Sequence, residues 1–135
     1  MHKTTITNLQ KTFEDYAKEV EGIEFWFARD LQNLLGYDKW ENFVNVIEKA
    51  KIACSKSGHD VNDHFPEVRK TINMPKGASK DIIDYMLTRY ACYLIAQNGD
   101  SRKEEIAFAQ SYFAIQTRKQ ELIEQRIALI ERLNT

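Results

Sequence analysis

Four basic side chains lie close together in the middle of this chain, with no acidic residue among them. They are Arg69, Lys70, Lys76 and Lys80, and the segment 68–80 that contains them has no Asp or Glu. Each cation that contacts a nucleic-acid phosphate releases a counterion, so such a cluster indicates a candidate polyanion-binding surface. The whole chain carries a net charge of −1, so any nucleic-acid site must be local. The alternative is that these lysines only protect a sheet edge and aid solubility.

The basic residues lie within a predicted β-hairpin. Residues 67–73 and 80–87 are two runs that contain β-branched side chains, and they flank a Pro/Gly turn segment at 74–79. This pattern predicts a projecting hairpin, placed where a winged helix has its wing. Residues 81–87 are also compatible with a helix, and the sequence alone leaves that alternative open.

A helix-turn-helix is predicted just before this hairpin. Residues 28–35 and a second run from Asp38 to about Cys54 repeat apolar side chains at helical spacing, and Gly36 lies between them. Asp38 and Glu41 have the spacing of a capping box for the second helix. Two amphipathic helices joined at a glycine also occur as purely structural hairpins, so the motif needs its structural context.

If the second helix enters a DNA groove, the residues near its start become candidates for contact. Arg29 and Lys39 begin the two helices and could contact the DNA backbone, and Asn42 could reach base edges. Trp26 and Trp40 could stack on exposed bases, but their positions favour packing in the core.

Three further helices are predicted around these elements. The first begins at a capping box formed by Thr7 and Gln10 and ends near Gly22. A buried helix follows Thr88, and a last, long helix follows a capping box formed by Ser101 and Glu104. The end of the last helix carries an apolar stripe that little remaining chain could cover, which suggests a partner interface. The stripe residues are Leu122, Ile123, Ile127, Ile130 and Leu133.

The sequence gives little support for catalysis. It has no glycine-rich phosphate loop, nucleophile elbow or HExxH motif, so we predict no catalytic residue and no cofactor. Cys54, His59 and His64 are the closest approach to a metal site, but no closely spaced Cys/His pair anchors them, and we predict no metal. Both cysteines, Cys54 and Cys92, lie in apolar helical patterns and are expected to pack as small hydrophobes.

Length and composition indicate an ordinary globular protein. The 135 residues are 43% hydrophobic and 29% charged, and no apolar run reaches the length of a membrane span. The start of the chain lacks the apolar core of a signal peptide, so a cytoplasmic protein is expected. We predict a domain over residues 1–118 and a helical extension over residues 119–135 that is truncated or mediates oligomerisation.

Several segments together resemble the bacterial DNA-damage-inducible protein D family. They are FWFARDLQNLLGYDKWENF from residue 25, AKIAC from 50, SGH from 57, DHF from 63, LTRYACYLI from 87, QNGD from 97 and YFAIQTR from 112. More distantly, the chain resembles the Bro N-terminal domain of phage antirepressors and viral Bro proteins, which are linked to DNA binding. Family members are longer, so the resemblance implies that this chain is an N-terminal portion.

The resemblance implies a role in the SOS response, including restraint of RecA-type recombinase filaments on single-stranded DNA. We therefore predict a mainly helical α+β fold with a helix-turn-helix, a β-hairpin wing and a long C-terminal helix, as in Bro-N domains. The predicted function is non-enzymatic binding to single- or double-stranded DNA, to a recombinase filament, or to both. The alternative is an antirepressor-like module that binds proteins, or a second copy of itself, through its C-terminal helix.

Overall fold

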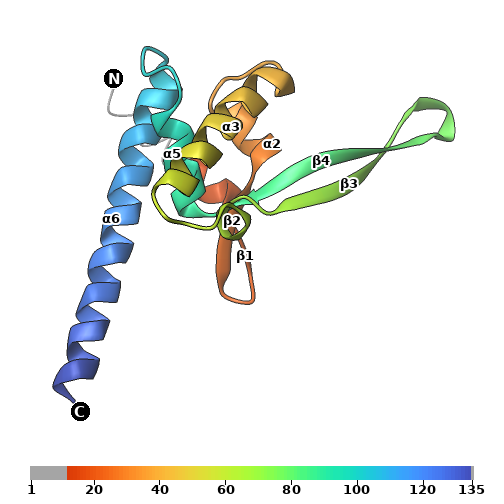
Figure 1. The fold of residues 1–135 in the computed structure, drawn as a ribbon. Helices are drawn as coiled ribbons and strands as arrows, with labels where there is room; N and C mark the ends of the chain where they lie inside the picture. The colour runs from red at the N-terminus through yellow and green to blue at the C-terminus, as the bar shows by residue number, and fades with distance from the viewer. Residues whose placement is uncertain (1–11, 135) are drawn as a thin grey trace.

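The computed structural model describes residues 12–134 and consists of a helical body from which two hairpins and the end of the last helix project (Figure 1). Residues 12–16 are helical. The elements that follow are β1 (Lys18–Val20), β2 (Ile23–Phe27), α2 (Ala28–Leu34), α3 (Trp40–Lys56), α4 (Val61–His64), β3 (Glu67–Asn73), the short 3₁₀ turn η1 (Pro75–Gly77), β4 (Ser79–Leu87), α5 (Arg89–Gln97) and α6 (Glu104–Leu133). The predicted α+β class, with a wing and a long last helix, is confirmed.

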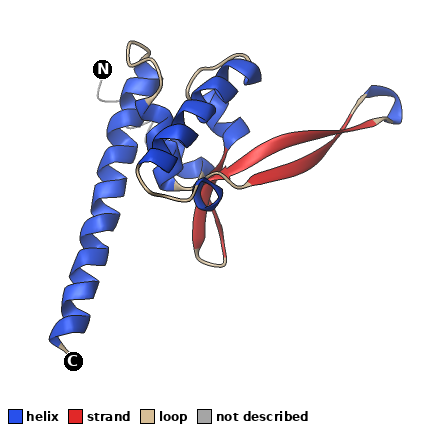
Figure 2. Ribbon diagram, in the orientation of Figure 1, coloured by secondary structure: helices blue, strands red, loops and turns tan. Residues whose placement is uncertain are grey.

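The four-stranded antiparallel sheet consists of two hairpins joined at their bases. Its strand order is β1-β2-β4-β3. Strand β4 pairs with β3 along its length, but with β2 only at Trp26 and Phe27. The β3–β4 hairpin therefore leaves the body as a two-stranded ribbon (Figure 2). The alternative of a helix over residues 81–87 is wrong, because those residues belong to β4.

The predicted N-terminal helix does not reach Gly22. Its proposed start at Thr7 lies outside the described residues, and the chain turns from helix into strand β1 after residue 16. Glu21 and Gly22 both have positive φ angles, of 52° and 82°, which is the geometry of a tight two-residue hairpin turn. Pairing of β1 with β2 therefore prevails over the helical spacing of the apolar residues, and Val20 is left 55% exposed.

The turn of the helix-turn-helix forms as its glycine predicts. Gly36 has a φ of +79° and donates its N–H to Asn33 O, and the N–H of Tyr37 reaches back to Gln32 O. These two bonds make a Schellman motif, which ends α2. The capping box predicted at Asp38 is wrong, because Lys39 occupies the N-cap position of α3 and no side chain caps that helix.

Helix α5 lies at the centre of the body, between α3 and α6 (Figure 1). Its Ala91, Cys92 and Ile95 are fully buried. Trp26 is also buried, and its indole N–H donates to Phe13 O over 2.9 Å while its ring meets Phe113 of α6 edge to face. The prediction that Trp26 and both cysteines pack in the core is confirmed.

Helix α6 begins in the body and then leaves it. The predicted Ser101/Glu104 capping box is wrong, since Lys103 is the N-cap and Asp100 instead accepts bonds from Arg102. Ile106, Ala109 and Phe113 are buried, whereas every residue from Arg118 to Asn134 is exposed. No helix within residues 12–134 is both long and apolar enough to cross a membrane.

A buried carboxylate joins the ribbon to the helix-turn-helix. Asp84 of β4 is 0% exposed. Its Oδ1 accepts the backbone N–H of Arg29 at 3.0 Å and that of Tyr85 at 2.8 Å, and its Oδ2 accepts the ammonium of Lys70 at 2.6 Å. Arg29 lies in the first turn of α2, which has no side-chain cap of its own. Asp84 therefore caps α2 from another element, where the helix dipole also favours a negative charge.

Replacing this carboxylate should destabilise the whole domain. We expect Asp84→Ala to lower the free energy of unfolding by about 2–4 kcal/mol, because it leaves two backbone N–H groups and an ammonium without their acceptor. Urea unfolding measures the loss. The matched control is Asp81→Ala, an exposed carboxylate on the same strand, with an expected change within about 0.5 kcal/mol. Equally small effects at both positions would contradict the capping role.

Candidate nucleic-acid interface

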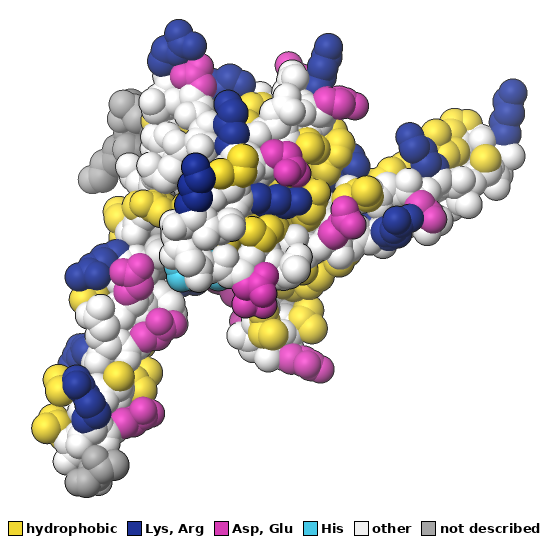
Figure 3. Space-filling model, viewed as in Figure 1, with side chains coloured by type: hydrophobic (Ala, Val, Ile, Leu, Met, Phe, Trp, Pro, Cys, Tyr) yellow, Lys and Arg dark blue, Asp and Glu magenta, His cyan; other side chains and the backbone are white. Residues whose placement is uncertain are grey.

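The outer part of the ribbon is free of the body. Every residue from 71 to 81 is exposed, and Lys and Arg side chains occur along the ribbon and at its end (Figure 3). By contrast, the acidic residues Glu19 and Glu21 lie on the β1–β2 hairpin. Lys76 and Lys80 therefore outnumber the single acid of the outer ribbon, Asp81, in a protein whose net charge is −1.

The register of the ribbon places its cations on both of its faces. Residues directly opposite each other in an antiparallel pair share a face, and successive residues alternate between faces. Lys70 pairs with Ile82 and Lys80 pairs with Ile72, so both lysines lie on one face. Arg69 lies on the other face, and Lys76 lies in the turn at the tip. The sequence cluster therefore does not form a single flat basic surface.

Three of the four ribbon cations are free. Arg69, Lys76 and Lys80 are exposed and form no ion pair with any residue between 12 and 134. Lys76 has a φ of +67°, a left-handed conformation that costs a lysine on the order of 1 kcal/mol relative to glycine. A cation is thus held at the tip despite its backbone strain.

Lys70 has a structural role. Besides its ion pair with Asp84, its ammonium lies 3.4 Å from the centroid of the Phe27 ring. The ring contact holds the base of the ribbon against β2, while the ion pair joins the two strands of the ribbon and engages the charge that a phosphate would need. The side chain is still 37% exposed, so it contributes to the local potential without being a free contact.

Arg29 has a similar structural role, whereas Lys39 and Asn42 are open to solvent. The Arg29 Nε–H donates to Ile83 O over 3.0 Å, and its guanidinium lies 4.1 Å from the ring centroid of Trp40. Trp40 in turn stacks on Tyr85 at the base of the ribbon, in agreement with its predicted packing role. Lys39 and Asn42 are exposed at the start of α3, beside this base.

The residues of the predicted partner interface are all exposed. The five stripe residues are between 43% and 75% exposed, on the part of α6 where every residue from 118 to 134 is exposed (Figure 3). A lone helix of this length is marginally stable in water, and its apolar side chains gain nothing from exposure. The stripe residues are Leu122, Ile123, Ile127, Ile130 and Leu133.

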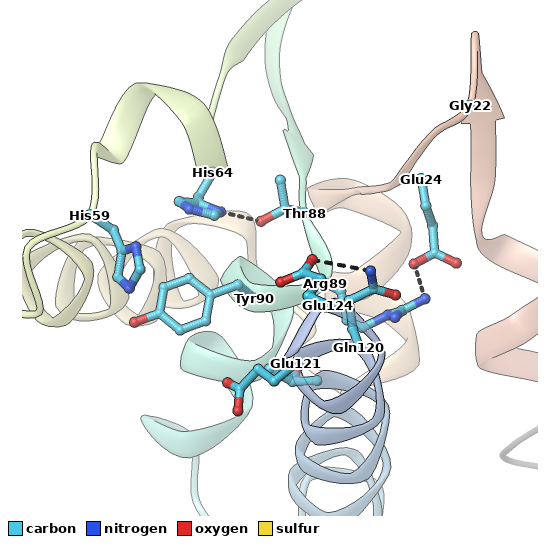
Figure 4. A pocket seen from close by; sticks show the side chains of 11 residues that line it. Gly22, Glu24, His59, His64, Thr88, Arg89, Tyr90, Gln120, Glu121 and Glu124 are labelled. Atoms are coloured by element: carbon cyan, nitrogen blue, oxygen red, sulfur yellow. Dashed lines mark hydrogen bonds and ion pairs between the residues drawn. The ribbon is translucent and has the colours of Figure 1, made fainter. Parts of the chain in front are cut away.

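A cavity of about 580 Å³ opens between α4, the start of α5 and the middle of α6 (Figure 4). Arg89 lines it but is ion-paired with Glu24, and Glu121 and Glu124 line the same space. Carboxylates therefore outnumber the single arginine, and the cavity is electrostatically unsuited to a nucleic-acid backbone.

The two histidines of the alternative metal site lie in this cavity's wall. Their rings meet edge to face at 5.6 Å, and both contact the ring of Tyr90. Cys54 is buried in the core, and its thiol donates a weak hydrogen bond to the backbone carbonyl of His59 over 4.0 Å. No group of three His, Cys, Asp or Glu side chains within residues 12–134 is arranged to hold a metal ion. Packing on Tyr90 accounts for the histidines without one.

Burial also shifts the pKa of His64. Its Nδ1 lies 2.7 Å from Thr88 Oγ1, which in turn caps α5 by accepting the N–H of Ala91. Burial lowers the pKa of His64 below its ordinary 6.5, and the neighbouring His59 lowers it further against the opposing effect of Asp63. The neutral imidazole is therefore the form that the fold prefers.

Comparison with known proteins identifies the family of this domain. The family model described as the BRO family, N-terminal domain, matches residues 16–114. The chain belongs to this family. The matched span includes both hairpins, the helix-turn-helix and α5, and it ends within α6 before the exposed stripe.

The second comparison is with the sequence of an individual protein. Over 101 residues the chain is 50% identical to DNA damage-inducible protein D of Escherichia coli strain K12. This match covers 75% of the chain but 37% of that protein, so the chain spans little more than a third of the relative's length. The resemblance read from the sequence is confirmed. No solved structure matches the chain.

Asp84 is the residue of this region that the sequence interpretation missed. It stands in a run of otherwise apolar residues, Ile82 to Leu87, and an acid in such a run is a signal of a buried, hydrogen-bonded carboxylate. The contacts of Asp84 distinguish the basic residues that stabilise the base of the ribbon from those that are free to bind DNA.

The lowered pKa of His64 predicts a pH-dependent stability. The unfolded chain binds a proton at His64 more readily than the folded one, so stability should fall as pH drops from 7 through the folded-state pKa. We expect the wild type to lose more unfolding free energy than His64→Asn between about pH 7.5 and pH 5.5. Urea unfolding of both proteins at the two pH values measures this, and an equal loss would contradict it.

Proposed function

We propose that this domain binds duplex DNA through the β3–β4 ribbon and acts in the response to DNA damage without catalysing a reaction. One observation carries the proposal: Arg69, Lys76 and Lys80 are unpaired within the described residues and lie on an element that projects away from the body. Free cations on a projecting element can reach phosphates without interference from the acidic surface elsewhere.

The distribution of these cations favours insertion of the ribbon into a groove. A groove is bounded by a phosphate backbone on each side, and β-ribbon proteins place their strands in either the major or the minor groove. Arg69 on one face and Lys80 on the other would then contact opposite backbones, with Lys76 leading at the tip. A ribbon lying flat on DNA would use only one of these faces.

The composition of the ribbon favours a duplex over a single strand. Proteins that bind single strands stack bases on aromatic side chains. Residues 67–84 contain no Phe, Tyr, Trp or His. Trp40 is the nearby aromatic residue that could stack on a base, but Arg29 and Tyr85 pack against its ring.

The base of the ribbon supplies orientation and a second contact. Arg29 and Lys70 hold the ribbon in place, and Lys39 and Asn42 at the start of α3 lie where a DNA backbone leaving the ribbon would pass. We therefore assign Lys39 to a phosphate and Asn42 to a base edge or sugar, as secondary contacts.

The name of the relative supports the biological setting. DNA damage-inducible protein D is named for its induction by DNA damage, and half of the aligned residues are shared. We extend the proposal to DNA that carries a RecA-type recombinase filament, the partner that the family resemblance implies. In that case the ribbon would contact DNA, while the exposed α6 stripe would be available to protein.

The ribbon proposal predicts a change in salt dependence. We expect Arg69→Gln, Lys76→Gln and Lys80→Gln together to weaken duplex binding and to lower the slope of log affinity against log salt by about 2–3 units, because three phosphate contacts are lost. Fluorescence anisotropy with labelled duplex, between about 50 and 200 mM salt, measures both quantities. Labelled single strands serve as the comparison ligand.

The control variant must change the net charge by the same amount as the ribbon variant, at sites off the ribbon. Lys18, Lys56 and Lys119 are exposed and lie off the ribbon, so their combined change to Gln has the same charge effect. This control should retain most of the slope. If the two triple variants lose affinity equally, the effect is one of net charge and the ribbon is not the contact surface.

The exposed stripe of α6 favours a second candidate function, that of a protein-interaction module. The apolar side chains from Leu122 to Leu133 are uncovered within residues 12–134, and the antirepressor-like alternative places a protein partner there. A second copy of this chain and a recombinase filament are the two partners to be tested. Either would bury the apolar stripe without involving the ribbon.

The stripe variant is Ile123→Gln, Ile127→Gln and Ile130→Gln. We expect it to abolish self-association, or cosedimentation with RecA-type filaments, whichever the wild type shows, because it removes the apolar area that drives contact. Sedimentation velocity measures both. Glu121→Gln, Glu124→Gln and Glu131→Gln change exposed polar positions of the same helix outside the stripe and should leave association intact. A wild type that neither self-associates nor binds filaments would refute this candidate.

A further inference from the structure

The outer ribbon carries apolar side chains as well as cations. Ile72 and Met74 of the outer ribbon and Ile83 nearer its base are 38–39% exposed, and within residues 12–134 no other element covers residues 71–81. A two-stranded ribbon alone in water is marginally stable, and exposed ribbon positions are usually polar. Phosphate binding explains the cations but does not explain these apolar groups.

The tip of the ribbon is compact and defined by the backbone. The N–H of Met74 donates to Ala78 O over 2.8 Å, which closes the turn, and Pro75 begins a short 3₁₀ turn between them. Lys76 and Gly77 then take positive φ angles of 67° and 78°. Met74 and Pro75 therefore stand at the end of the ribbon in a preorganised turn, with the cationic Lys76 beside them.

This combination matches the chemistry of proteins that open a base step. Such proteins place apolar wedges, commonly Met, Pro or Ile, between base pairs from the minor groove, and basic side chains hold the flanking phosphates. The wedge unstacks the step and bends the duplex. A flexible, polarizable Met side chain fills an irregular gap between bases, and a Pro has no backbone N–H to desolvate.

We infer that Met74 and Pro75 at the ribbon tip insert between base pairs of duplex DNA from the minor groove and bend it. This inference rests on the proposed function, because the free cations must first bring the ribbon to the duplex. Insertion of the tip adds to the proposed function a preference for DNA that is easily deformed. A mismatched or damaged step is already partly unstacked, so the tip would enter it at a lower energetic cost.

The test compares the wild type with Met74→Gln, which keeps the size and flexibility of the side chain but makes it polar. Three readouts use the full 135-residue chain: the end-to-end energy transfer of a doubly labelled duplex, the fluorescence of 2-aminopurine within the duplex, and the affinity for perfect against singly mismatched duplex. Ile23→Gln is the matched control, because Ile23 is an exposed apolar residue on the other hairpin.

We expect the wild type and Ile23→Gln to bend the duplex, to raise 2-aminopurine fluorescence and to bind the mismatched duplex about tenfold more tightly. Met74→Gln should keep the wild-type salt slope, since its cations are intact, but lose the bend and most of the tenfold preference. A second variant, Pro75→Ala, should lose part of the bend, and its retained salt slope would show that the ribbon still folds.

Other outcomes separate this inference from the proposed function. If the wild type binds duplex with the expected salt slope but does not bend it, or if Met74→Gln bends it equally, the insertion is overturned and duplex binding stands. If no duplex binding is found, both fall. Binding to phosphatidylserine vesicles with loss in Met74→Gln, and no unstacking of DNA, would assign the tip to a membrane surface and overturn the inference.

Discussion

The structure depends on a buried carboxylate that is shared by two elements. Asp84 of β4 accepts the N–H of Arg29, at the uncapped start of α2, and the ammonium of Lys70 on β3. Because a fully buried charge is tolerated only when its hydrogen bonds are made, the ribbon and the helix-turn-helix must form together in one relative orientation. The contacts of Asp84 therefore fix the orientation of the ribbon at its base relative to α2.

This interaction also determines which basic residues are available for binding. Lys70 and Arg29 have their charges or donors engaged at the base of the ribbon, whereas Arg69, Lys76 and Lys80 have no ion pair in the part of the chain that the structure describes. A net charge of −1 is compatible with a local positive field, because Asp81 is the single acid among residues 68–83 of the ribbon and Asp84 is buried among donors. The free cations occupy both faces and the tip of the ribbon, which is the arrangement that a groove with two phosphate walls requires.

Two surfaces of the described chain are more apolar than contact with water alone would favour. The ribbon has exposed isoleucine and methionine side chains next to its cations, and the end of α6 has an apolar stripe. They differ in character. The ribbon combines apolar and basic groups, which suits nucleic acid, while the stripe is a broad apolar band that suits protein. The BRO-family match spans the ribbon and ends at residue 114, before the stripe.

The sequence by itself determined the elements whose signals are local. Gly36 ends α2 because a left-handed residue is needed there, the Pro/Gly segment at 74–79 closes the ribbon, and the apolar run after Thr88 forms the buried α5. It did not determine the β1–β2 hairpin, since helical spacing and strand pairing compete over the same residues and only the partner strand decides between them. Nor did it show that Lys70 and Arg29 are structural, or that Arg69 and Lys80 lie on opposite faces. Those facts follow from strand register and from the burial of Asp84, and both arise from contacts between residues far apart in the chain.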